Sequence, residues 1–135
     1  MNFFHRYKWA IVFFGLGIIF TLARFIVGPS IPEGYTKLEK SEVESVLNAE
    51  GDKILIDLRD KQSYTQGHLP NSISIAPREL TAARMEELSG NKTKPIIVMS
   101  DTDKSSSKIA LKIGHTGYTK VYDLGGFENW KHMIP

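Results

Sequence analysis

The sequence of 135 residues contains no cysteine, which excludes disulfides, thiolate chemistry and cysteine-ligated metals. A strong charge of either sign is absent as well, since 17 lysines and arginines stand against 15 aspartates and glutamates. Electrostatics therefore give no reason to expect a nucleic-acid partner. No two of the four histidines have the spacing of a metal-binding pair, so we predict neither a metal nor another cofactor.

The first 27 residues contain no acidic side chain and include a long hydrophobic segment. An uncharged run extends from Trp9 to Ala23 and continues past Arg24 to Val27. As a helix with a rise of ~1.5 Å per residue, the stretch from Trp9 to Val27 would span about 28 Å, close to the ~30 Å hydrocarbon core of a bilayer. We therefore predict that residues 1–28 are a single-pass anchor in contact with the lipid bilayer, and that residues 29–34 are a linker.

Two other interpretations of this segment stay open. The first eight residues form a basic region, and Thr21-Leu22-Ala23 has the form of a cleavage site. The segment therefore also fits a signal peptide whose removal would release a secreted domain. A buried core helix fits less well, because a small domain has too little interior for a helix that is apolar all round. Basic residues flank both ends of the run, so both membrane orientations stay open.

Residues 35–135 are long enough for one domain with a single hydrophobic core. Short apolar runs alternate there with segments of helical spacing, and this alternation predicts an α/β fold with a parallel sheet. The predicted strands are 35–37, 54–56, 72–75, 96–99 and 121–124, with Gly125 ending the last one. The predicted helices are 40–48, 61–66, 77–88, a segment from 105–107 to 113, and 127–133.

The stretch 95–107, PIIVMSDTDKSSS, has the pattern of a binding or catalytic site. A buried strand ends at Met99, polar residues follow from Ser100, and the next helix is predicted to begin with Ser105–Ser107 as its cap. The N-terminus of a helix presents free backbone N–H groups, which favour an anion or a nucleophile nearby. Ser100 stands where such a nucleophile would be.

Three ordered motifs resemble the rhodanese domain. ILIDLRD and QGHLPNSISI are similar to its buried strand with Asp-x-Arg and to its Gly-His-x-Pro turn with the following strand, and GYTKVYDLGGFENW resembles its closing segment. The resemblance runs from about Tyr35 to Pro135 and implies a small central parallel sheet with helices on both faces. A membrane helix before a single domain of this kind also resembles small anchored bacterial proteins.

Active members of that family carry a cysteine at the start of a loop of about six residues, form a persulfide on it, and pass the sulfane sulfur to an acceptor. The resemblance puts Ser100 at the cysteine position, where a hydroxyl cannot form a persulfide. The loop contains neither the arginine often found there nor a histidine that could activate the serine, and its two aspartates oppose the binding of an anion. The loop residues are Ser100, Asp101, Thr102, Asp103, Lys104 and Ser105.

Three other motif residues have two interpretations each. Asp57 and Arg59 either line the mouth of the pocket or are structural, with Asp57 capping a neighbouring turn and Arg59 pairing with an acid. The family fold implies that His68 hydrogen-bonds the backbone of its loop, and catalysis is its second interpretation.

The sequence therefore predicts a catalytically degenerate rhodanese-like domain that is anchored in a membrane, expected to be the bacterial inner membrane. There it would act as a binding or regulatory module for a protein partner, because a serine replaces the nucleophile in an otherwise intact scaffold. The alternative is an enzyme of the rhodanese and phosphatase scaffold, with residual sulfur-, phosphoryl- or acyl-transfer activity at Ser100 and an aspartate as base.

Overall fold

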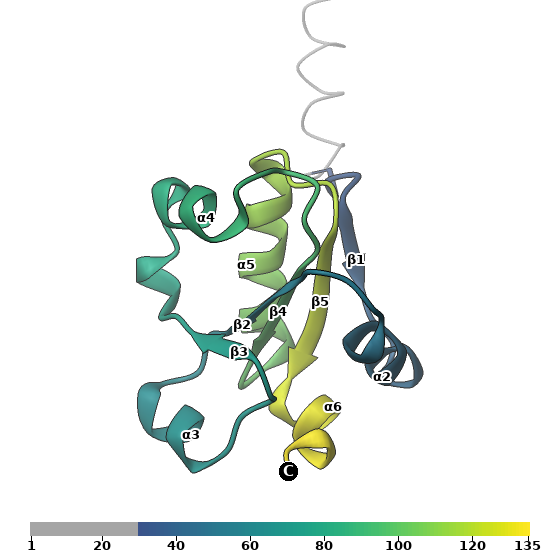
Figure 1. Cartoon of the computed structure of the whole chain (residues 1–135), viewed down its shortest axis with the longest axis vertical. Coiled ribbons are helices and arrows are strands. Elements are labelled where there is room, and N and C mark those ends of the chain that lie inside the picture. The colour runs from purple at the N-terminus through teal and green to yellow at the C-terminus, as the bar shows by residue number, and fades with distance from the viewer. Residues whose placement is uncertain (1–29) are drawn as a thin grey trace, which may run out of the picture. The chain divides into compact units, whose positions relative to one another are not determined.

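The computed structural model describes residues 30–135 of the chain (Figure 1). The predicted anchor, from Trp9 to Val27, lies outside the described residues and stays a prediction. Within residues 30–135, no helix combines the length and the hydrophobicity that crossing a membrane requires.

A five-stranded sheet forms the centre of the domain, and every neighbouring pair of strands is parallel. The strands are β1 (Tyr35–Lys37), β2 (Ile54–Asp57), β3 (Ser72–Ser74), β4 (Ile96–Ser100) and β5 (Val121–Gly126). Their order across the sheet is β1-β5-β4-β2-β3. All residues of β2 and β4 are buried, which explains why both strands are continuous apolar runs in the sequence. The predicted parallel α/β fold is confirmed.

Helices cover both faces of this sheet (Figure 1). They are α2 (Lys40–Asn48), α3 (Lys61–Gln66), the 3₁₀ helix η1 (Pro77–Glu79), α4 (Ala82–Ser89), α5 (Asp103–His115), α6 (Phe127–Trp130) and the 3₁₀ helix η2 (Lys131–Met133). Residues of β4 alternate between two cores. Ile96 and Val98 pack with Ile109 of α5, whereas Ile97 and Met99 pack with Trp130 of α6.

Several predicted element boundaries differ from the structure, three of them by more than one residue outside the candidate site. The helix expected over 77–88 is divided into η1 and α4, because buried Leu80 interrupts it and the Thr81 side chain caps α4 by accepting the backbone N–H of Arg84 at 3.1 Å. The segment 127–133 is likewise divided into α6 and η2. β5 does not end at Leu124 but continues through the two glycines.

An irregularity in β5 makes this continuation possible. Val98 pairs with Asp123, but Met99 pairs with Gly125, so one residue of β5 is left over as a bulge. Gly125 has a φ of +80°, and a Cβ atom there would lie 2.4 Å from Oδ1 of Asp103. The backbone conformation therefore favours glycine at this position, and any side chain would also have to displace the side chains of Asp103 and Asn129.

Substitution of Gly125 by alanine is expected to destabilise the domain by about 2–4 kcal/mol, because strain at positive φ and a steric clash act together. The matched control is Gly117→Ala, since Gly117 has a φ of +94° with no atom within 4 Å of a Cβ. The control should lose only about 1 kcal/mol. Urea denaturation of residues 30–135, followed by the fluorescence of Trp130, measures both. Equal losses would show that the contact with α5 has no energetic importance.

Candidate functional site

The candidate site lies at the carboxyl edge of the sheet, between β4 and β2. From β2 the chain proceeds to β3 on one side, and from β4 it proceeds to β5 on the other, so the direction of winding changes between these two strands. Ligands of open parallel sheets bind at such switch points, outside the carboxyl ends of the strands. Ser100, the last residue of β4, lies at this point.

Ser100 is buried, with 4% of its surface exposed, and is paired with Gly126 of β5. Within residues 30–135 its hydroxyl makes no hydrogen bond to any side chain. An activated serine needs a base within hydrogen-bond distance of its oxygen. The geometry around Ser100 therefore provides no such base.

The connection after Ser100 is shorter than the sequence indicated. Only Asp101 and Thr102 join β4 to α5, and Asp103, Lys104 and Ser105 already form the first turn of the helix. Thr102 is the cap, since its side chain accepts the N–H of Ser105 at 3.2 Å. The prediction that Ser105–Ser107 cap the helix was therefore wrong.

Both aspartates of the predicted loop lie beside the start of α6. Oδ1 of Asp103 accepts hydrogen bonds from the backbone N–H of Gly126 at 2.7 Å and from the side-chain amide of Asn129 at 2.9 Å. The carbonyl of Asp101 accepts the N–H of Phe127 at 3.2 Å. These bonds fix the connection, and the carboxylate of Asp103 is already engaged in holding two elements together.

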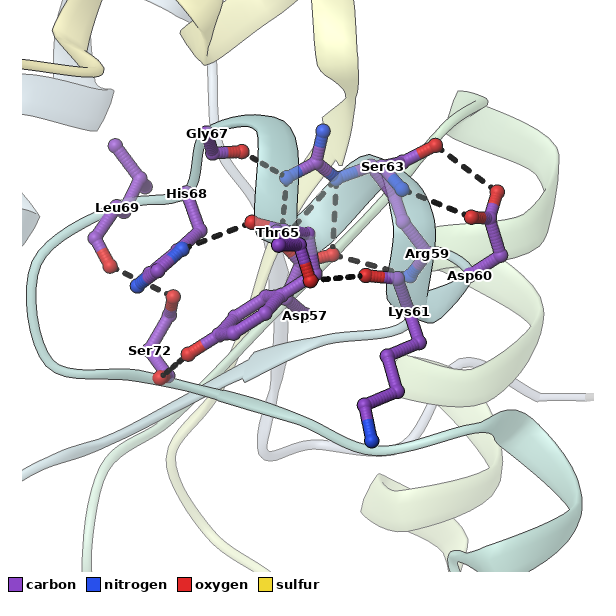
Figure 2. Close-up of polar contacts among 11 residues, drawn as sticks. Asp57, Arg59, Asp60, Lys61, Ser63, Thr65, Gly67, His68, Leu69 and Ser72 are labelled. Atoms are coloured by element: carbon purple, nitrogen blue, oxygen red, sulfur yellow. Dashed lines mark hydrogen bonds and ion pairs between the residues drawn. The ribbon is translucent and has the colours of Figure 1, made fainter.

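Asp57 and Arg59 form a buried ion pair at the end of β2, with N–O distances between 2.8 and 3.2 Å. Figure 2 shows that the same guanidinium also donates to the carbonyl of Gly67, at 2.7 Å. The rings of Phe127 and Trp130 lie 4.8 and 4.7 Å from the guanidinium carbon. The guanidinium of Arg59 therefore contacts a carboxylate, a carbonyl and two aromatic rings of its own domain.

His68 lies in the turn before β3. Its Nδ1 is 2.9 Å from the carbonyl oxygen of Tyr64, and its ring stacks on the Tyr64 ring with centroids 3.9 Å apart (Figure 2). The Tyr64 hydroxyl in turn donates to the carbonyl of Ser72 at 2.6 Å. These contacts connect His68 and Tyr64 to the turn between α3 and β3.

Sequence reasoning missed the buried carboxylate of Asp123 in β5. It accepts hydrogen bonds from the hydroxyl of Tyr35 at 2.8 Å, from the N–H of Gly125 at 3.0 Å, and from the hydroxyls of Ser106 and Ser107. The carboxylate thereby joins β1, β5 and α5 beneath the candidate site. The sequence offered one indication of this network, an aspartate inside the otherwise apolar segment VYDL. The hydroxyl groups that donate hydrogen bonds to this aspartate are far away in the sequence.

A cavity of about 610 Å³ lies beside the ends of β2 and β3. Its charged lining residues are Arg59, Asp60, Lys61, Arg78 and Glu79, and Ser100 does not line it. The N–H and hydroxyl of Ser63 hold the pKa of Asp60 below its ordinary value (Figure 2). Within the described part of the chain, no three acidic or histidine side chains are grouped so that they could hold a metal ion.

The fold and this edge define a small parallel α/β domain with serine at the end of its central strand. The sequence model of the rhodanese-like domain matches residues 39–133. The chain therefore belongs to the rhodanese-like domain family. Its lack of cysteine is consistent with replacement of the family's catalytic cysteine.

Two curated relatives illustrate the range of the family. The chain is 35% identical over 87 residues to a thiosulfate sulfurtransferase, GlpE, of Coxiella burnetii, covering 62% of this chain and 77% of that protein. It is 29% identical over 94 residues to an uncharacterized protein, YibN, of Escherichia coli K12, covering 69% of this chain. The match spans 65% of the length of the Escherichia coli relative.

Solved structures show the same fold at low sequence identity. A rhodanese with anions from E. coli has a TM-score of 0.53 at 24% identity, with 58% of this chain and 91% of that chain covered. A rhodanese-like domain protein from Staphylococcus aureus has a TM-score of 0.55 at 19% identity, with 70% and 90% covered. These likenesses support the architecture of the domain.

Substitution of Asp57 by asparagine is expected to destabilise the domain by about 3–5 kcal/mol, because it leaves the Arg59 charge buried without a counter-charge. The matched control is Glu87→Gln, which breaks the exposed pair that Glu87 forms with Arg84 at 2.8 Å. That change should cost at most about 0.5 kcal/mol. Urea denaturation measures both values, and a small loss for Asp57→Asn would contradict the structural role of the pair.

Alkaline pH is expected to destabilise the domain through Tyr35. Burial raises the pKa of the Tyr35 phenol above its ordinary value of 10.0, with further contributions from Asp123. A raised pKa in the folded state gives stability that is complete below the unfolded pKa and is lost as the pH rises through the folded value. The free energy of unfolding should therefore fall above about pH 10, and Tyr35→Phe should reduce that slope. Identical pH profiles of the two proteins would refute this assignment.

Proposed function

We propose that the chain is a membrane-anchored, catalytically degenerate rhodanese-like domain that binds a protein partner at the bacterial inner membrane and serves there as a binding or regulatory module. The observation that carries this proposal is Ser100 at the end of β4, in a chain without cysteine. The anchor is the hydrophobic segment from Trp9 to Val27.

The chemistry of sulfur transfer supports the loss of activity. The reaction needs a thiolate that attacks a sulfane donor and carries the sulfur as a persulfide. A serine oxygen cannot replace that sulfur, and a cysteine elsewhere cannot substitute for it because the chain has none. The Coxiella burnetii relative is named a thiosulfate sulfurtransferase, and a chain without the nucleophile cannot carry out that reaction.

The surface around Ser100 suits recognition of a partner. Asp101, Thr102, Lys104 and Ser105 are all exposed, although the backbone that carries them is fixed by the cap of α5 and by the bonds to α6. A preorganised polar surface loses little conformational freedom when it binds. The residues after Ser100, which in an active family member would surround the persulfide sulfur, therefore present hydrogen-bond donors and charges on a fixed backbone.

Transfer of a phosphoryl or acyl group by Ser100 is the second candidate. The start of α5 beside Ser100 favours it, since helix N-termini stabilise anions. Against it, the carboxylate of Asp103 is engaged with Gly126 and Asn129, and no base contacts the Ser100 hydroxyl within residues 30–135. The binding role therefore has the stronger support.

Ser100→Cys is expected to create a protein that takes up one sulfur atom from thiosulfate, because the new thiol would stand at the start of α5. Mass spectrometry of the intact chain detects the added sulfur, and an adduct can form only at position 100 because the chain has no other cysteine. The wild type and Ser100→Ala are the controls and should show none. Failure of a folded Ser100→Cys would mean that the connection Asp101–Thr102 no longer has the productive geometry.

Wild-type chain is expected to turn over neither thiosulfate nor a generic phosphoester. Turnover that is abolished by Ser100→Ala would overturn the binding role and favour the enzyme.

Fractionation with N-terminal sequencing should find the intact chain in the membrane, and a topology reporter fused after Pro135 assigns the side of the membrane on which the domain lies. A chain that begins after Ala23 in the soluble fraction would refute the anchor.

A further inference from the structure

The amino edge of the sheet, opposite Ser100, is where the chain enters the domain. Gly34 accepts the N–H of Val121 at 2.8 Å, and Thr119 donates its N–H to the carbonyl of Lys92 at 3.0 Å. Pro32 lies so close to the end of α5 that its Cγ would be 2.7 Å from a Cβ on Gly114. Segments 31–34, 90–95 and 112–120 therefore form one surface, which we call the entry surface.

The entry surface is basic. Its only acidic residue is Glu33, and its basic residues outnumber that carboxylate. These basic residues are Lys92, Lys94, Lys112, His115 and Lys120. Lys92 and Lys94 pair with carboxylates of neighbouring segments, at 3.7 and 2.8 Å. Lys112 and Lys120 are exposed and form no ion pair within residues 30–135.

An apolar side chain accompanies these charges. Ile31 is 71% exposed and is the single exposed large hydrophobic residue of the described part of the chain. Exposed lysines beside an exposed apolar residue are the combination that binds the interface of a membrane, since cations attract anionic headgroups and apolar groups enter the acyl boundary.

The length of the linker limits the distance between the entry surface and the bilayer in an anchored chain. Ile31 follows the end of the predicted span, Val27, by four residues. A chain reaches at most ~3.6 Å per residue, so about 14 Å separate the two at full extension. The headgroup layer on each side of the hydrocarbon core is about 5–8 Å thick. In an anchored chain Ile31 can therefore reach the headgroup layer, and even at full extension of the linker it lies no more than about 9 Å beyond that layer.

We propose that the entry surface rests on anionic lipid headgroups, with Lys112 and Lys120 facing the phosphates and Ile31 in the interface. The proposal rests on the anchored arrangement given under Proposed function. It directs the opposite edge of the sheet, which carries Ser100, away from the lipid. The domain would then be held in one orientation, whereas a freely tumbling domain would present the site in all directions.

A single introduced cysteine provides the test, because the chain contains no other. Thr119→Cys in the full chain is labelled with a fluorophore and reconstituted into nanodiscs that carry a nitroxide quencher on a lipid headgroup. The discs contain either phosphatidylcholine alone or phosphatidylcholine with a third of phosphatidylglycerol. Labelled Gln62→Cys, in α3 near the carboxyl edge, reports the opposite side of the sheet (Figure 1).

Quenching at position 119 is expected to increase in the anionic discs, with about a tenfold rise in the ratio of docked to undocked domain. Quenching at position 62 should stay low in both kinds of disc. Lys112→Glu combined with Lys120→Glu should return position 119 to its value in neutral discs, and so should 1 M salt, where the Debye length is ~3 Å. The matched control is Lys40→Glu with Lys61→Glu, which changes the net charge equally but lies outside the entry surface and should leave docking unchanged.

Two failures have different meanings. If the chain enters the discs but position 119 is quenched no more than position 62, or equally in both lipids, the proposal is overturned and the anchored binding role stands. An equal effect of the two charge reversals would also overturn it, since net charge alone would then explain the attraction. If the full chain does not enter the discs at all, both the anchor and the entry-surface proposal are wrong.

Discussion

The buried charge of Arg59 is the constraint on which the carboxyl half of the domain depends. A guanidinium without water must be paired and must have its donors satisfied, or it costs several kcal/mol. Here Asp57 supplies the counter-charge, Gly67 supplies a carbonyl, and two aromatic rings of α6 lie beside the guanidinium, 4.8 and 4.7 Å from its carbon. One side chain thereby fixes the end of β2, the turn before β3 and the last helix. The motif Asp-x-Arg therefore has a structural explanation that does not depend on a cysteine nucleophile.

The architecture around Ser100 is closely connected although the chain has no cysteine. The bulge at Gly125 still lets β5 approach the start of α5, and Asp103 still joins that helix to α6. Asp123 holds the same region from beneath with bonds from three elements. This rigid scaffold around Ser100 supports the proposed recognition role, because binding then requires little reordering.

Most of the architecture could be predicted because it depends on local hydrophobic patterns. The continuous apolar runs of β2 and β4 indicated strands buried on both faces, and the alternation with helices indicated parallel pairing. The start of α5 could not be predicted, since Thr102 and the three serines after Lys104 are all good caps and the choice depends on distant contacts with α6. The Asp123 network was missed for the same reason, because its donors become neighbours only when the fold has formed. Ser100 was located because position alone, after a buried strand, identifies it.

The pairing of β1 with β5 has a consequence for the order of events during synthesis. Tyr35 and its partner Asp123 are separated by 88 residues, so β1 leaves the ribosome long before the strand that completes it. At the usual rate of elongation this interval is roughly 4–18 s. During that time β1 has no neighbouring strand. Its pairing with β5 joins residues that are very far apart in the sequence. Folding of this domain must therefore be completed after translation of its last strand, and a nascent chain that stops before Val121 lacks the strand with which β1 pairs.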